Sequence, residues 1–256
     1  IRDMKRPDVL LGRTGVYLPG SQPKIWFTYR NTVTIEFALR KLNVEQFLAD
    51  QSDDEGGSQR TTPTINAFED WGDDDDDAVK NAGKMVASWR VNLPESSMAA
   101  ATSSTLIPHD EIGEYLLEAR IPETDEVSRA IILVTSTAIV HESQSDQTLL
   151  TIVDARTGER LPSETLRVIQ SDPSRKKLRS TEYESNEAGE VIVASSEEND
   201  ALIYVRTKSR GKAFLSLTDL GSRAWTEPIL SSYTATDRPV YRPGEVMQFR
   251  SWYRQQ

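Results

Sequence analysis

The chain has 256 residues, which is enough for about two domains of ordinary size. It has 40 acidic and 30 basic residues, a formal net charge of −10, and no cysteine. The lack of cysteine excludes disulfides, thiolate metal sites and cysteine nucleophiles. The acidity argues against nucleic-acid binding, and two histidines, His109 and His141, are too few for an ordinary zinc site.

No segment carries a targeting or membrane signal. The longest apolar run, from Ala130 to Val134, is far shorter than a membrane-spanning helix, and no signal-peptide pattern is present. We therefore expect no membrane insertion by this chain. Because it begins at Ile1 and not at Met, we expect it to be a fragment or a processed product.

The first half of the chain predicts one β-sandwich. Residues 1–22 are expected to form a linker. Apolar and polar residues then alternate with the period of a half-buried strand, which predicts strands at 25–30, 33–39, 87–93, 115–121 and 131–140. Asn31 is a predicted turn residue, and Asn43 is a predicted cap for one short helical turn. Residues 95–105 are small and polar and are expected to form a loop. These elements place a first domain at 23–142.

An acidic insertion interrupts this domain at about 51–83. Eleven acids lie between Asp50 and Lys80 against Arg60 and Lys80, so this stretch carries −9 of the net charge. The run Asp73–Asp77 lacks the spacing of a calcium loop and is interpreted as a solvated loop. Trp71 is either an interaction anchor or part of that loop. The flanking strands predict that the insertion leaves and re-enters the same domain.

The second half predicts another sandwich at 145–232. Strands are expected at 149–153, 166–169, 191–194, 202–205 and 213–217. Loops with a glycine that favours a positive φ are expected at Asp154–Gly158, Asn186–Gly189 and Arg210–Gly211. The last residues, 233–256, begin a third unit, in which Pro243-Gly244 separates two strands. Many short strands at this spacing indicate sandwiches.

No pattern of catalytic residues is present. His109 and His141 lack a second histidine at ligand spacing, and neither a nucleophile elbow nor a phosphate loop occurs. Trp26 and Trp89 lie in apolar strands and are interpreted as core residues. We expect no catalytic residue, no cofactor site and no metal site, and we expect that the chain is not an enzyme.

The string from Thr236 to Glu245, TDRPVYRPGE, resembles the start of the MG2 domain in the α2-macroglobulin family. Weaker likenesses to bacterial members cover Ser21–Leu48, Gly113–Glu118 and Asp154–Pro162, where Arg160-Leu161 intervenes before the proline. The motif positions, which the resemblance gives a structural role, are Asp237, Arg238, Pro239, Tyr241, Pro243 and Gly244.

The resemblance implies an all-β fold of tandem macroglobulin-like, fibronectin III-like antiparallel sandwiches. It implies a scaffold segment of a bacterial endopeptidase inhibitor, a protease trap that is periplasmic, envelope-anchored or secreted. Its partners would be proteases, through the full-length parent, and other domains of that parent. The thioester motif C-x-E-Q of the family has no place in this chain. An adhesion or surface-display module is the alternative, since sandwiches serve there too.

Overall fold

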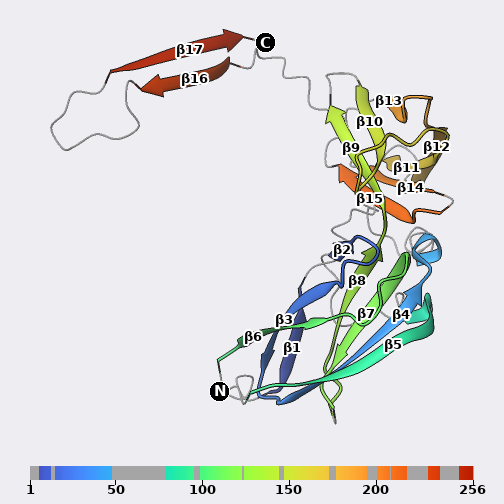
Figure 1. Cartoon of the computed structure of the whole chain (residues 1–256), viewed down its shortest axis with the longest axis vertical. Coiled ribbons are helices and arrows are strands. Elements are labelled where there is room, and N and C mark those ends of the chain that lie inside the picture. The colour runs from blue at the N-terminus through green and yellow to red at the C-terminus, as the bar shows by residue number, and fades with distance from the viewer. Residues whose placement is uncertain are drawn as a thin grey trace.

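The structure is a computed structural model, and it is built almost wholly from β-strands (Figure 1). It describes residues 6–12, 15–47, 79–94, 99–122, 124–143, 147–172, 177–194, 201–207, 209–217, 230–236 and 248–255. A helical turn at 44–47 follows the fourth strand, and residues 79–80, just before the fifth strand, are also helical. The predicted all-β fold class is confirmed. Among the described residues, no helix is long and apolar enough to cross a membrane.

The first sandwich packs a three-stranded sheet against a five-stranded sheet. The smaller sheet has the order β1 (Asp8–Leu11), β3 (Lys24–Arg30) and β6 (Ala101–Leu106). The larger has the order β2 (Gly15–Tyr17), β8 (Val127–Val134), β7 (Gly113–Arg120), β4 (Thr34–Leu42) and β5 (Ala82–Asn92). Neighbouring strands are antiparallel except β2 and β8, which are parallel.

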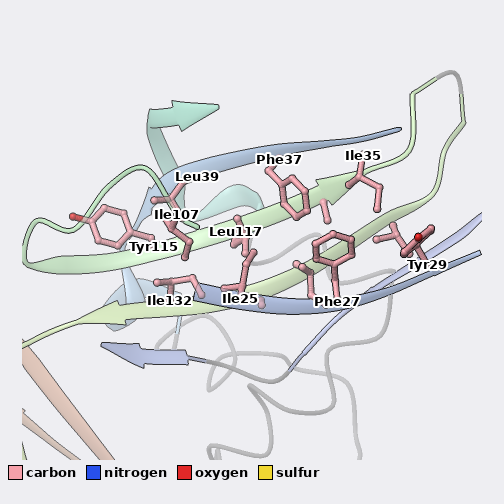
Figure 2. Packing of buried hydrophobic residues seen from close by; sticks show 14 of the residues in the cluster. Ile25, Phe27, Tyr29, Ile35, Phe37, Leu39, Ile107, Tyr115, Leu117 and Ile132 are labelled. Atoms are coloured by element: carbon pink, nitrogen blue, oxygen red, sulfur yellow. The ribbon is translucent and has the colours of Figure 1, made fainter. Parts of the chain in front are cut away.

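The core of this sandwich lies between the two sheets, where alternate side chains of β3 meet those of β4 and β7 (Figure 2). The ring centroids of Phe27 and Phe37 are 5.3 Å apart. Trp89 stacks on Phe37 at 5.1 Å and donates its ring N–H to Thr105 Oγ1 at 3.0 Å, so its predicted core role is confirmed. Trp26 points out of the sheet and is 57% exposed, so its predicted core role is wrong.

Tyr115 fixes the start of β7. Its hydroxyl donates to the carbonyl oxygen of Glu111 at 2.9 Å and lies 2.9 Å from His109 Nε2. Burial, with the nearby charges of Glu111 and Glu114, raises the pKa of Tyr115 to about 12. A buried tyrosine that bonds back to the chain a few residues upstream resembles the tyrosine corner of immunoglobulin-like sandwiches.

The second sandwich also has two sheets. The three-stranded sheet has the order β13 (Glu190–Ala194), β10 (Gln147–Asp154) and β9 (Thr137–Ser143). The four-stranded sheet has the order β12 (Lys177–Glu184), β11 (Thr165–Asp172), β14 (Ala201–Arg206) and β15 (Lys212–Leu217). A separate core, which includes Leu150, Ile152, Val168 and Ile203, lies between them. The predicted hairpin of β14 and β15 is confirmed, with Gly211 at φ 84° in its turn.

Two stretches expected to lack strands contain them. The predicted linker 1–22 contains β1 and β2, because Val9 and Leu11 alternate with exposed residues and enter the core. The predicted loop 95–105 contains most of β6, which pairs with β3 from Ala101 to Leu106. A full ladder of backbone hydrogen bonds offsets the weak β-propensity of that small, polar sequence.

The single strand predicted at 131–140 is two strands. It breaks at Thr135 and Ser136, and β9 pairs with β10 and not with β8. The chain therefore changes sandwich at 135–136, ahead of the expected boundary between 142 and 145. The predicted boundary is wrong because the end of β8 and the start of β9 are both apolar and rich in β-branched residues, so composition alone does not separate the two strands.

The acidic insertion connects two neighbouring strands. β4 and β5 pair along their length, so the insertion leaves and re-enters one sheet, as predicted. Its expected end at Gly83 lies inside β5. Asn43 caps the helical turn as predicted, with Oδ1 accepting the backbone N–H of Gln46 at 3.2 Å. Residues 51–78, with Asp73–Asp77 and Trp71, lie outside the described residues.

The last described element is the antiparallel hairpin of β16 (Leu230–Thr236) and β17 (Phe249–Gln255). The predicted turn at Pro243-Gly244 lies in the segment between these strands. That segment, 237–247, is outside the described residues.

Candidate functional site

The described residues form a further buried contact outside the two cores, at the surface where the two sandwiches meet, which is called the joint here. Its apolar part is a third buried cluster, separate from both cores. The first sandwich contributes Leu42, Val44, Phe47, Leu116, Ile131 and Leu133, and the second contributes Leu202, Ile169 and Phe214. Phe47, Leu116 and Leu202 are each 0% exposed. Burial of this kind is worth about 1.5–3 kcal/mol for each large apolar side chain, so the joint is a strong contact.

The sequence builds this surface by breaking the alternation of two strands. In β8, every residue from Ala130 to Val134 is buried, and in β14 the same is true from Ala201 to Val205. A strand of an isolated sandwich buries one face alone. Here the second face of each strand is buried in the joint, through Ile131 and Leu202 among others.

Charged side chains close one side of the joint. Lys212 Nζ of β15 lies 3.1 Å from Glu45 Oε1 in the helical turn and 3.2 Å from Glu114 Oε2 of β7. Arg206 of β14 pairs with Glu45 as well. Burial acts to raise the pKa of Glu45, but the hydrogen bonds and charges of Lys212 and Arg206 together hold it below its ordinary value of 4.5. Glu45 therefore binds the second sandwich in its ionised form.

The lowered pKa of Glu45 predicts a pH-dependent contribution to stability. Glu45→Gln should lower the free energy of unfolding by about 1 kcal/mol at pH 7, the size expected for partly exposed ion pairs. A depressed carboxylate pKa stabilises the fold above the ordinary value, and that stability is lost as pH falls through the folded-state pKa. The difference between native and variant protein should thus shrink below pH 4.5. Urea unfolding across pH measures it.

Glu187→Gln is the matched control, because Glu187 is an exposed residue in the turn before β13. It should leave stability unchanged across the same pH range. A Glu45→Gln deficit that stays constant as the pH is lowered would show that Glu45 does not act through its charge.

Hydrogen bonds hold the connection between the sandwiches, Thr135-Ser136, against the turn that contains Arg210. The backbone N–H of Ser136 and the hydroxyl of Thr135 both donate to the carbonyl oxygen of Arg210, at 2.8 and 2.9 Å. The turn that carries Arg210 has no room for a side chain at Gly211, where an added Cβ would lie 2.9 Å from Ile112 and Thr135. This predicted turn therefore docks the second sandwich against the first.

The loop after β10 forms the other part of this connection. Asp154 Oδ1 accepts the backbone N–H groups of Arg156 and Thr157 at 2.9 and 3.0 Å, and Oδ2 pairs with Arg210. These bonds, led by the one from Thr157, lower the pKa of Asp154. The ordered loop lets Ala155 N–H donate to Ser136 O at 2.7 Å.

The same loop reaches across to the first sandwich. Arg156 Nη2 donates to the carbonyl oxygen of Pro19, which precedes β3, at 2.9 Å. The resemblance over Asp154–Pro162 thus falls on a loop that contacts both sandwiches and the connection at Ser136. Because all of these contacts are made to other residues of the same chain, we interpret the loop as one that positions the two sandwiches relative to each other.

The sequence-predicted residues lie elsewhere. The motif residues Asp237, Arg238, Pro239, Tyr241, Pro243 and Gly244 lie outside the described residues. His109 is bonded to Tyr115, and His141 is exposed on β9. In the described parts of the chain, no three His, Asp or Glu residues are placed to hold a metal ion.

Sequence reasoning missed the joint. The signal was present in the run Ala130–Val134, which is continuous where alternation is expected, and in the similar run Ala201–Val205. Such a run predicts burial on both faces of a strand but does not name the surface that covers it.

No family model matches the sequence, and no curated protein matches it. Among solved structures, the chain is similar to native alpha-2-macroglobulin from Escherichia coli spanning domains MG0-NIE-MG1, at 14% identity and a TM-score of 0.60, covering 83% of this chain and 64% of that chain.

A second structure of native alpha-2-macroglobulin from Escherichia coli spans domains NIE-MG1 alone. The likeness has 15% identity and a TM-score of 0.58, and it covers 83% of this chain and 98% of that one. At such identities the likeness concerns the fold. The chain therefore shares the fold of the NIE-MG1 segment of a bacterial alpha-2-macroglobulin, a pair of consecutive β-sandwich domains.

Proposed function

We propose that this chain is a structural scaffold segment of an alpha-2-macroglobulin-like endopeptidase inhibitor. In this role it binds no substrate and catalyses no reaction. It holds two sandwiches in a fixed relation, so that domains attached to it are correctly placed. The observation that carries the proposal is the fold likeness that covers 98% of the two-domain NIE-MG1 structure.

The joint supports a scaffold role because it is built to resist bending. A flexible linker between domains is polar and makes few contacts. Here a buried apolar cluster, the ion pairs of Lys212 and the hydrogen bonds of Ser136 surround a connection of two residues. A force applied to one sandwich is therefore passed to the other.

The parent protein of this segment would trap proteases after they cut an exposed segment of it. The parent would be periplasmic, envelope-anchored or secreted. The hairpin of β16 and β17 would begin an MG2-type domain, which the string Thr236–Glu245 supports. Its partners would be proteases, met through the parent, and the other domains of that parent.

The isolated chain should not inhibit a protease. Trapping requires that a cut in one part be coupled to movement of many domains, whereas the described part of this chain forms two sandwiches and one hairpin. We expect trypsin and elastase, each mixed with an excess of the chain, to digest a large protein substrate at their normal rates. Stoichiometric protection of that substrate would contradict a purely structural role.

The full-length parent provides the positive test. A trap leaves the bound protease active toward a small chromogenic peptide while it shields it from a large protein substrate. We expect the parent to show that difference after treatment with trypsin. Equal loss of both activities would indicate a blocked active site, and loss of neither would remove the inhibitor function.

A further inference from the structure

The outer face of the five-stranded sheet carries a hollow that the scaffold role does not use. Its volume is about 520 Å³, and its floor is formed by two small residues, Ala38 of β4 and Ser88 of β5, which lie opposite each other. Larger side chains of β4, β5 and β7 surround these positions. Small residues between long ones leave a recess in an otherwise flat sheet face.

The wall of the hollow is rich in arginine. Arg40, Arg90 and Arg120 line it together with Glu36 and Glu118. Arg90 pairs with Glu36, and Arg40 Nε lies 3.3 Å from Glu118 Oε2. The Glu118 carboxylate is shared, because Arg129 Nε lies 3.2 Å from its other oxygen.

The positive charges of this wall are not balanced. Three guanidinium groups and two carboxylates line the hollow, and the Arg90 and Arg40 side chains are 61% and 39% exposed. Arg120 is exposed at the end of β7, and within the described part of the chain it has no ion-pair partner. The hollow therefore presents guanidinium donors that favour carboxylates.

The chain itself carries the matching charge. Residues 48–78 contain eleven acids and one base, a formal charge of −10. The whole chain also has a charge of −10, so the remaining residues sum to zero. This segment joins β4 to β5, the two strands that form the floor of the hollow.

The positions are compatible. The hollow centres on the pair Ala38 and Ser88, and the segment departs and returns near the pair Leu42 and Ala82 of the same two strands. Four residues of β-strand span roughly 13 Å, whereas a chain of this length reaches several times that distance.

We propose that the arginine-lined hollow is an intramolecular docking site for the acidic segment 48–78, whose carboxylates bind Arg40, Arg90 and Arg120. Tethering gives the acids an effective concentration in the millimolar range, so individually weak pairs are sufficient. The same tether disfavours an acidic partner protein, because such a partner would compete with acids that are covalently attached to this chain. Docking is electrostatic and should disappear at high salt.

Chemical modification of arginine tests the proposal. Phenylglyoxal rates at single arginines, measured by mass spectrometry, would be compared between the native chain and an amide variant in which all eleven acids of 48–78 are replaced by their amides, which changes the net charge from −10 to +1. At low salt, we expect Arg90 and Arg120 to react about five-fold more slowly in the native chain, as expected for a few exposed ion pairs. At about 0.5 M salt the two proteins should react alike.

Controls separate docking from a general field effect. Arg179 on β12 is exposed on the other sandwich and should react equally in both proteins. Arg120→Gln should reduce the protection of Arg90, and Arg179→Gln should not. Equal rates at Arg90 and Arg120 in the native chain and the amide variant would overturn the proposal. Protection that increases with protein concentration would do so too, since a second copy would then supply the acids.

Discussion

Phe37→Ala should destabilise the first sandwich by about 3–5 kcal/mol, the range for truncation of a buried phenylalanine. Phe37 is 1% exposed and lies between Phe27 of the opposite sheet and Trp89 of the neighbouring strand. Its removal leaves a cavity between these two rings and removes its contacts with both. The measurement is urea unfolding followed by far-UV circular dichroism, which reports on the strands of the sandwich.

Trp26→Ala is the matched control for this prediction. Trp26 lies on β3 beside Phe27, but its ring is 57% exposed and its recorded ring contact is with Lys24 Nζ at 4.7 Å. We expect a change of less than about 0.5 kcal/mol, as for most surface substitutions. If the Trp26 variant loses as much stability as the Phe37 variant, the assignment of inward and outward faces on β3 is wrong.

Leu202→Asp should separate the two sandwiches while each stays folded. Leu202 lies in the joint and is 0% exposed, so an aspartate there would be a buried, unpaired charge. Opening the joint hydrates that charge at the cost of the apolar contact, a loss of about 2–5 kcal/mol. Calorimetry should show one unfolding transition for the native pair of sandwiches and two for the variant.

Ile192→Asp is the control for an added charge on the second sandwich. Ile192 is 59% exposed on the outer face of β13, so its replacement should leave a single transition. Phe47→Ala weakens the joint from the side of the first sandwich without adding charge, and it should lower the coupling in the same direction. A single transition in both joint variants would mean that the joint does not couple the two units.

Much of the fold follows from local patterns. The alternation in 33–39 and 115–121, the turn at Asn31 and the hairpin at Arg210-Gly211 predict elements that the structure contains. In each case a side-chain period of two or a turn residue with a positive φ determines the local conformation. These signals need no knowledge of distant residues.

The missed elements depend on distant partners. β1 and β6 are short or polar, and they become strands because β3 offers hydrogen bonds on both its edges. The break at Thr135-Ser136 is fixed by Arg210, which is far away in the sequence. Local sequence patterns do not predict these pairings, because the partners are far apart in the chain.

The joint, too, is only partly predictable from local sequence. Its apolar residues are visible in the sequence as runs that fail to alternate, and Lys212 and Glu45 are ordinary charged residues there. The sequence does not predict that these apolar runs pack together or that Lys212 pairs with Glu45, because both contacts join two different sandwiches.

The central claim is that the two sandwiches form one rigid unit through the joint. Residual dipolar couplings of backbone amides, measured in a weakly aligned sample, test it most directly, because they report the orientation of each sandwich. We expect the couplings from β3, β4 and β7 and those from β10, β11 and β14 to fit one alignment tensor of one magnitude. Two tensors of different magnitude would show that the sandwiches move independently, and that result would contradict the scaffold account.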